Sequence, residues 1–157
     1  MLATGVFQES SAGLRNALIR THHITSRKKV AKLRQAAAAQ DVFVLLRSGG
    51  SPGIMYAEGL EAGVSEWVSC VQVRLVHVGS LEHVLMISQR LQYKDYQLAA
   101  RVAPVALDRN ALRTSDLDRA GLHEVESVKA FAEEMSKRAV LDWWRRAMGY
   151  AGEDSRL

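Results

Sequence analysis

Cysteine is nearly absent from this chain, and what is missing excludes several classes of protein. The single cysteine, Cys70, excludes an internal disulfide bond and a zinc site built from several cysteines, so we expect it to be a small core residue. No uninterrupted apolar run approaches the roughly 18 residues that a membrane helix needs. The N-terminus lacks the basic start and apolar core of a secretory signal. We therefore expect a soluble intracellular protein, of the nucleus or cytoplasm, with no membrane partner.

Carboxylates are missing from residues 15 to 34, although the whole chain carries 17 of them. The same stretch holds seven cations and two adjacent histidines: Arg15, Arg20, Arg27, Lys28, Lys29, Lys32 and Arg34, with His22 and His23. Such a block predicts a surface that binds a polyanion. The alternative is a solvated helix face whose charges only keep the protein soluble.

The length of 157 residues fits one domain with a usable hydrophobic core. Residue patterns predict strands at 16–22, 42–47, 54–58 and 93–101, and helices at 26–40 and from about residue 60. The predicted fold class is α+β. The order βαββαβ indicates a ferredoxin-like antiparallel sheet with two helices on one face. We expect residues 15–104 to form this domain, and residues 1–14 to be disordered or frayed.

The amino-acid composition of the chain changes after Pro104. Residues 105–120 are polar and turn-rich, which predicts a linker. Across residues 121–150 apolar side chains recur every three or four positions, which predicts one long C-terminal amphipathic helix ended by Gly149, before a tail at 151–157. We expect this helix to close the open sheet face or lie beside it; the alternative is a partner-binding helix. Trp143 and Trp144 are adjacent, so only one of them can face fully inward.

The segment RSGGSPGIMYAEG, residues 47–59, predicts a glycine-rich turn that leads into a short buried strand. Backbone N–H groups between Gly49 and Gly53 can form a small anion nest; the alternative is a tight hairpin without a ligand. The segment lacks the endings of a P-loop and of a dinucleotide-binding turn, so nucleotide hydrolysis is not indicated. Neighbouring histidines on a strand point to opposite faces, which argues against a shared metal ion. We predict no enzyme, no cofactor and no metal site.

Four segments together resemble the C-terminal domain of the spliceosomal pre-mRNA-processing factor three family: HHITSRKK, RSGGSPGIMYAEG, RLQYKDYQLAAR and VESVKAFAEEMSKRAVLDWWRRAMGY. The last segment is most similar to members, especially fungal ones, in which this domain follows an RWD domain. The resemblance covers most of residues 17–150. It implies a ferredoxin-like fold that, in the spliceosomal member, contacts small nuclear RNA, including a single-stranded end beside a duplex. No RWD domain precedes the domain here, so we expect an isolated domain or a truncated gene model.

Residues 73–89 depart from the family pattern, in which the second helix runs directly into the last strand. Removing these 17 residues leaves EWVSCVQRLQYKDYQ, a family-like join. One explanation is a translated, retained intron, because the codon of Val73 begins with GT and the codon of Gln89 can end with AG. The other is a genuine insertion. The gene sequence and a transcript across the join would decide between them.

The residues together predict an RNA-binding module that contacts phosphates. Tyr93 and Tyr96 have opposite parity along their strand, so at most one of them lies on a given face, which disfavours base stacking. The predicted RNA-binding residues are Arg20, His22, His23, Arg27, Lys28, Lys29, Lys32, Arg47, Gly49, Gly50 and Lys94. The alternative is a protein-interaction module that uses Trp143 and Trp144.

Overall fold

The computed structural model describes residues 13–73 and 97–150. The predictions that concern Tyr93, Lys94, Tyr96, the tail, most of the 1–14 segment and nearly all of the 73–89 insertion lie outside these residues. The described elements are β1 (Leu14–Thr21), α2 (Arg27–Ala39), β2 (Phe43–Arg47), β3 (Gly53–Leu60), α3 (Glu61–Val73), β4 (Gln97–Pro104), β5 (Gly121–Val125), α5 (Val128–Lys137) and α6 (Leu141–Met148).

The fold is a mixed α+β arrangement built on one sheet, whose strand order is β4-β1-β3-β2-β5. The pairs β4–β1, β1–β3 and β3–β2 are antiparallel, whereas β2 and β5 are parallel. As a result β1, β2 and β5 run in one direction, and β3 and β4 run in the other. The C-terminal ends of β1, β2 and β5 therefore lie at the same end of the sheet as the N-terminal ends of β3 and β4.

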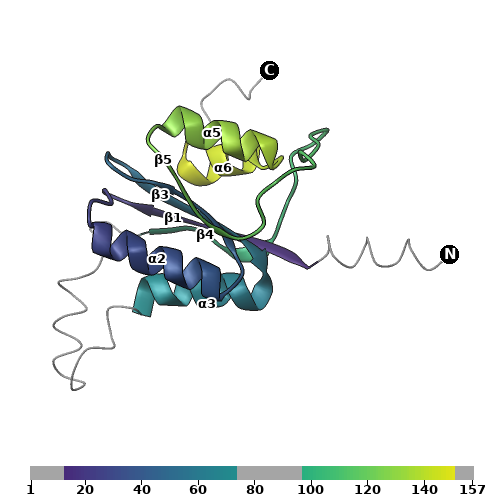
Figure 1. Cartoon of the computed structure of the whole chain (residues 1–157). Helices are drawn as coiled ribbons and strands as arrows, with labels where there is room; N and C mark the ends of the chain where they lie inside the picture. Colours follow the sequence, from purple (N-terminus) through teal and green to yellow (C-terminus); the bar gives the residue numbers. More distant parts are fainter. Residues whose placement is uncertain (1–12, 74–96, 151–157) are drawn as a thin grey trace.

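Helices cover both faces of the sheet. Figure 1 shows α2 and α3 on one side and α5 and α6 on the other. Along β2, Val44 and Leu46 belong to the core under α2 and α3, while Phe43 and Leu45 belong to the core under α5 and α6. This explains why β2 reads as a continuous apolar run, since side chains on both of its faces are buried.

Helix α2 starts and stops where its sequence predicts. The side chain of Ser26 accepts a hydrogen bond from the backbone N–H of Lys29, which caps the helix, and alanines favour the helical interior. Val30, Leu33 and Ala37 form its buried stripe. The chain leaves the helix through Gln40, and Asp41 takes a positive φ of 53°.

The long helix predicted for residues 121–150 is wrong. Its first residues form β5, because parallel pairing with β2 satisfies their backbone groups. The Ser127 side chain then caps α5 by accepting from the N–H of Ala130. The helix ends at Lys137, and Ala139, with a φ of 58°, turns the chain before α6 begins. Both helices lie on the sheet face left open by α2 and α3, where the sequence placed this segment.

The segment between Pro104 and Gly121 contains no helix or strand, yet specific contacts hold it to the rest of the fold. Val140, the N-cap residue of α6, makes no side-chain capping bond. Instead, the Asp108 carboxylate accepts from the backbone N–H groups of Asp142 at 2.9 Å and of Trp143 at 3.1 Å. The predicted linker therefore supplies the cap of a helix that lies more than thirty residues further along the chain.

Within the described ranges, no helix combines the length and the apolar character that crossing a membrane demands.

Candidate nucleic-acid interface

Most of the predicted RNA-binding residues meet at one end of the sheet. Strand pairing places Thr21 opposite Gly53, Arg20 opposite Gln97, and Arg47 opposite Ile54. The end of β1, the start of α2 and the β2–β3 loop are consequently neighbours. We call this region, residues 20–29 and 47–53, the basic end of the sheet. The sequence separates its two parts by seventeen residues, and the antiparallel pairing of β1 with β3 brings them together.

The first turn of α2 carries Arg27, Lys28 and Lys29, and no acidic residue. The Arg27 guanidinium donates two hydrogen bonds to the Glu124 carboxylate of β5, at 2.9 and 2.8 Å. Arg34 lies two helical turns after Arg27 on the same face of α2, and it donates to the same carboxylate at 3.0 Å. The hydrogen bond from Arg27 is the main reason that the pKa of Glu124 lies below its ordinary value. Arg27 therefore has a partner within the protein and is a weaker candidate for binding a phosphate.

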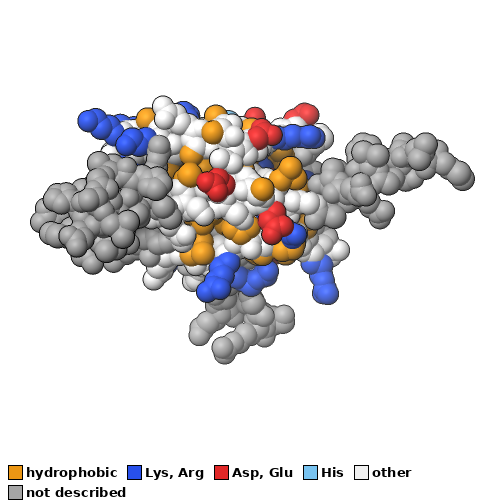
Figure 2. Space-filling model, turned by 90° about the horizontal axis from the view of Figure 1, so that it is seen from below, with side chains coloured by type: hydrophobic (Ala, Val, Ile, Leu, Met, Phe, Trp, Pro, Cys, Tyr) orange, Lys and Arg blue, Asp and Glu red, His pale blue; other side chains and the backbone are white. Residues whose placement is uncertain are grey.

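Lys28 and Lys32 lie one helical turn apart, and both are exposed. Neither makes a hydrogen bond or an ion pair with the residues that the structure describes. Lys29 is half-buried, and burial lowers the pKa of its amino group. Figure 2 looks onto the side of α2 and α3, where Lys and Arg side chains lie toward the margins and hydrophobic and acidic side chains occupy the middle. The cations thus border this face without covering it.

Arg47 does not fit its predicted role. Its Nε donates to the backbone carbonyl of Glu126 at 3.2 Å, and its Nη1 donates to the carbonyl of Pro52 at 2.7 Å. These bonds tie the end of β2 to Pro52 in the β2–β3 loop and to Glu126, which follows β5. Arg47 packs so tightly over Gly50 that a Cβ there would lie 2.8 Å from Nη2 of Arg47. A side chain at position 50 would therefore have to displace the end of the Arg47 side chain.

Two of the backbone N–H groups predicted to form an anion nest in the glycine loop are already used within the protein. The N–H of Gly49, whose φ is 84°, donates to the carbonyl of Ile24 at 3.3 Å. The N–H of Gly53 donates to the carbonyl of His22 at 3.1 Å. Both amides are used to fasten the loop to the segment between β1 and α2. The role of Gly49 is therefore to shape this end of the sheet.

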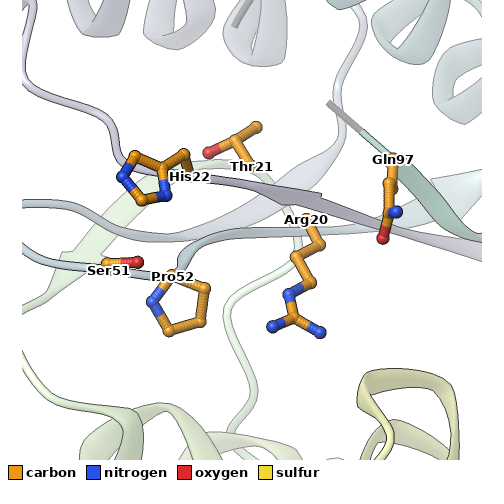
Figure 3. Close-up of a pocket in the computed structure, with 6 residues that line it drawn as sticks. All are labelled: Arg20, Thr21, His22, Ser51, Pro52 and Gln97. Atoms are coloured by element: carbon orange, nitrogen blue, oxygen red, sulfur yellow. The ribbon is translucent and has the colours of Figure 1, made fainter. Parts of the chain in front are cut away.

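A cavity of about 280 Å³ opens beside the loop, at the end of β1. Its lining residues are Arg20, Thr21, His22, Ser51, Pro52 and Gln97, none of which is acidic. In Figure 3 the side chains of Arg20 and Gln97 project to the same side of the sheet, and Ser51 and Pro52 approach from the β2–β3 loop. Arg20 makes no hydrogen bond or ion pair with any described residue, so its guanidinium can meet an anion here.

His22 and His23 lie beyond Thr21, the last residue of β1, and not within a strand as predicted. Their rings are in contact, with centroids 4.4 Å apart. The expectation that they face opposite sides therefore fails, because strand geometry has ended. In the part of the chain that the structure describes, no three or more His, Cys, Asp or Glu side chains gather in a way that would hold a metal ion.

Trp144 is buried, with 2% of its surface exposed, and stacks on Phe131 with ring centroids 5.5 Å apart. It cannot be a partner-binding surface in the folded protein, so that prediction is corrected. Trp143 is half-buried and meets the Tyr56 ring edge-on at 5.9 Å. The apolar stripe of α6 faces the sheet because its residues belong to the second core.

Sequence reasoning missed a second polar constellation, at the opposite end of the sheet. The buried Glu58 carboxylate accepts from Arg113 at 3.0 and 2.7 Å, from Arg138 at 2.7 Å and from the Tyr56 hydroxyl at 2.8 Å. Asn16 in turn donates to the Tyr56 hydroxyl at 3.2 Å. The Arg138 guanidinium also lies 3.3 Å from the centre of the Phe43 ring. We call these five polar residues the Glu58 network: Asn16, Tyr56, Glu58, Arg113 and Arg138.

The Glu58 network shifts the ionisation of its members. Burial alone would raise the pKa of Glu58, but the hydrogen bonds and charge of Arg113 and the charge of Arg138 outweigh it and hold that pKa below its ordinary value. Burial and the neighbouring Glu58 charge raise the pKa of Tyr56 well above its ordinary range. Four hydrogen bonds satisfy the Glu58 carboxylate, whereas the buried Nε of Arg138 makes no hydrogen bond and lies 3.5 Å from the Glu134 carboxylate. The network therefore fixes β1, β3, α5 and the segment 105–120 in place.

Two signals in the sequence could have revealed the network. Glu58 is a charge inside an otherwise apolar strand, IMYAEG. Arg138 continues the stripe of Phe131 and Met135 at helical spacing, in a position where an apolar residue is normal. A charge in each of two apolar patterns indicates that the two are paired, because an isolated buried charge is costly.

Comparison of the chain with models of known protein families gives no match, and comparison with curated proteins gives none either.

Proposed function

We propose that this chain is a non-catalytic RNA-binding module built on a ferredoxin-like core, and that the basic end of the sheet contacts RNA phosphates. The order β4-β1-β3-β2 and its antiparallel pairing support the ferredoxin-like assignment, with β5 as an addition at the edge. The family resemblance carried by residues 17–150 belongs to the same proposal. The observation that carries the function is the first turn of α2, with three cations and no carboxylate.

Cations at this position are unfavourable for the helix itself. The N-terminus of a helix already carries a partial positive charge, and a cation placed there typically costs about 0.3–1 kcal/mol. Glu124 offsets this cost for Arg27, but Lys28 lacks such a partner among the described residues. A bound phosphate would supply the missing negative charge, because helix N-termini with flanking cations attract anions.

Because helices cover both faces of the sheet, RNA bases cannot stack on it. Proteins of the RRM type stack bases on aromatic side chains of an exposed sheet face. Here Phe43 and Tyr56 are buried beneath α5 and α6, and the opposite face is covered by α2 and α3. Contact through phosphates is therefore the mode that the described residues favour. Such binding tolerates sequence changes and weakens steeply as salt is added.

The protein-interaction alternative loses its support from sequence. It was based on the resemblance to RWD-associated proteins and on Trp143 and Trp144; Trp144 is buried against Phe131, and Trp143 is half-buried. The exposed residues of α6 include Asp142, Arg145 and Arg146, which are charged and not apolar. RNA binding is the function we retain.

Fluorescence anisotropy with a short single-stranded RNA and an end-frayed duplex, over a salt series, tests the proposal. The double variant Arg20→Gln, Lys28→Gln should bind more weakly, and its plot of log affinity against log salt should be shallower by about 0.7 for each lost single-strand contact. The matched control is Arg109→Gln, Arg119→Gln, which removes the same charge from exposed positions outside the basic end. Absent binding in low salt, salt-insensitive binding, or equal effects of the two variants would overturn the proposal.

A further inference from the structure

Ser51 occupies the tip of the β2–β3 loop and combines exposure with a specific sequence context. Its side chain is exposed, and it is flanked by two glycines and Pro52. The chain has only two prolines, and the other one follows Ala103, so Ser51 is the only serine or threonine in the sequence followed by proline. A serine before proline is the acceptor used by proline-directed protein kinases.

The surroundings of Ser51 suit a phosphate group. Ser51 lines the cavity of about 280 Å³ at the end of β1 together with Arg20, His22 and Gln97, and no acidic residue lines it. The Arg20 side chain has no ionic partner among the described residues, and it lines the same cavity as Ser51. The Glu124 carboxylate lies beside the loop, where it accepts a hydrogen bond from Ser48 at 3.0 Å and is already paired with Arg27 and Arg34.

We propose that Ser51 is a phosphorylation site whose phosphate pairs with Arg20 in this cavity and switches off RNA binding at the basic end of the sheet. In the modification, the Ser51 Oγ forms a bond to the γ-phosphorus of ATP. The bond from that phosphorus to the β,γ-bridging oxygen breaks, and ADP and the hydroxyl proton leave. The product carries up to two negative charges at neutral pH, in a region where the proposed function needs positive charge. The switch thus rests on the proposed function, whereas the pairing with Arg20 does not.

The loop is held in a way that keeps the phosphate at this end of the sheet. Gly49 and Gly53 donate to the carbonyls of Ile24 and His22, and Arg47 holds the Pro52 carbonyl. A phosphate on Ser51 therefore stays beside the end of β1 and the start of α2, and does not swing away into solvent. It competes with RNA phosphates for Arg20 and lowers the positive potential around Lys28.

Two measurements on the full chain test the site without RNA. Incubation with a proline-directed kinase and ATP should place one phosphate on Ser51 and none on Ser48, as read by mass spectrometry; no phosphate on Ser51 overturns the proposal. In protein carrying phosphoserine at position 51, phosphorus NMR should give a second phosphate pKa below the ordinary value of about 6. Arg20→Gln should return that pKa toward the ordinary value, and an unchanged titration in this variant overturns the pairing.

The switch itself is tested by RNA affinity at about 0.1 M salt. Ser51→Glu should bind roughly 5-fold more weakly than the uncharged control Ser51→Gln, and phosphoserine should weaken binding further, with the difference shrinking as salt is added. Equal affinities of the two variants and of the phosphorylated chain would overturn the switch. If the unmodified chain binds no RNA, the proposed function fails, and the NMR titration still decides whether the phosphate pairs with Arg20.

Discussion

Arg138 donates a hydrogen bond of 2.7 Å from Nη1 to Oε2 of Glu58, and both side chains are buried, with exposed fractions of 0% and 5%. The pair joins α5 to β3 across the sheet face that the C-terminal helices cover. Arg113 adds a second guanidinium from the segment between β4 and β5, and Glu134, 3.5 Å from Arg138, supplies a second carboxylate. Buried charges of this kind are stable only as a set, because each would be costly without the others.

Replacing Glu58 should therefore be severe. Glu58→Gln removes the counter-charge of the partly buried Arg113 and leaves the buried Arg138 with only Glu134, at 3.5 Å, so we expect the free energy of unfolding to fall by about 3–5 kcal/mol. Urea denaturation followed by tryptophan fluorescence measures this. Glu61→Gln is the control, because Glu61 is exposed and lies 3.7 Å from Arg15, a geometry that contributes about 0–1 kcal/mol. A loss at Glu58 no larger than at Glu61 would contradict the assigned role.

Acid should destabilise the protein through Glu58 and Glu124. Both carboxyl groups have a pKa below the ordinary value in the folded protein, so their ionised forms stabilise the fold. This stabilisation is complete above the unfolded pKa of about 4.3 and is lost as the pH falls through the lower folded values. Urea unfolding at pH values between 7 and 3 should show the decline, and Glu124→Gln should make it shallower. A free energy of unfolding that stays level over this range counts against the prediction.

Charge reversal at the start of α2 should separate folding from binding. Lys28→Glu places a negative charge in the first helical turn, and we expect the free energy of unfolding to rise by about 0.3–1 kcal/mol. RNA affinity should fall in the same variant. Thermal or urea unfolding and anisotropy, measured on one preparation, check both effects. A variant that loses both stability and binding would show that Lys28 holds the fold together and is not kept for a ligand.

Truncation of Trp144 should affect folding directly. Trp144→Ala removes a buried ring stacked on Phe131, and we expect a loss of about 3–5 kcal/mol in the free energy of unfolding. Trp143→Ala should cost clearly less, because Trp143 is only half-buried. The two variants compared by urea denaturation make the test. Equal losses would mean that the two rings are buried to the same degree in solution.

Removing the cap supplied by Asp108 should weaken α6. Asp108→Ala deletes an acceptor for the N–H groups of Asp142 and Trp143, at a cost of about 1 kcal/mol, typical for a helix cap. Asp116→Ala is the matched control, since Asp116 is exposed and lies in the same segment. Denaturation curves for both variants give the difference. If the two curves coincide, the carboxylate of Asp108 does not stabilise the helix.

The sequence predicted the first half of the fold well because its signals are local. Ser26 and the alanines that follow define α2, and the run from Phe43 to Arg47 has the length and residue types of a strand. Residues 121–125 were misread because Leu122, Val125 and Val128 share a spacing of three, which fits a helix as well as a strand followed by a cap. These residues form a strand because they pair with β2, nearly eighty residues earlier in the sequence. No local pattern carries information about that pairing.

Only part of the candidate site could be predicted, because the rest also depends on contacts between distant segments. The block of cations from Arg20 to Lys32 is visible in the sequence, but its proximity to the glycine loop depends on the pairing of β1 with β3. The partners that remove Arg27 and Arg47 from the binding surface are Glu124 and the Glu126 carbonyl, which arrive with β5. The cavity beside Ser51 depends on the register between β1 and β4, which a shift of one residue would change.

The late arrival of β5 has a consequence for how the protein is made. A ribosome delivers residues in order, so β2 gains its outer neighbour, and Phe43 and Tyr56 gain their cover, only after residues 121–148 have left the exit tunnel. During synthesis the nascent sheet exposes an unpaired edge strand and a hydrophobic face, and under these conditions aggregation competes with folding. Shortening the gene after β4 would make that transient state permanent, and the product should accumulate in inclusion bodies.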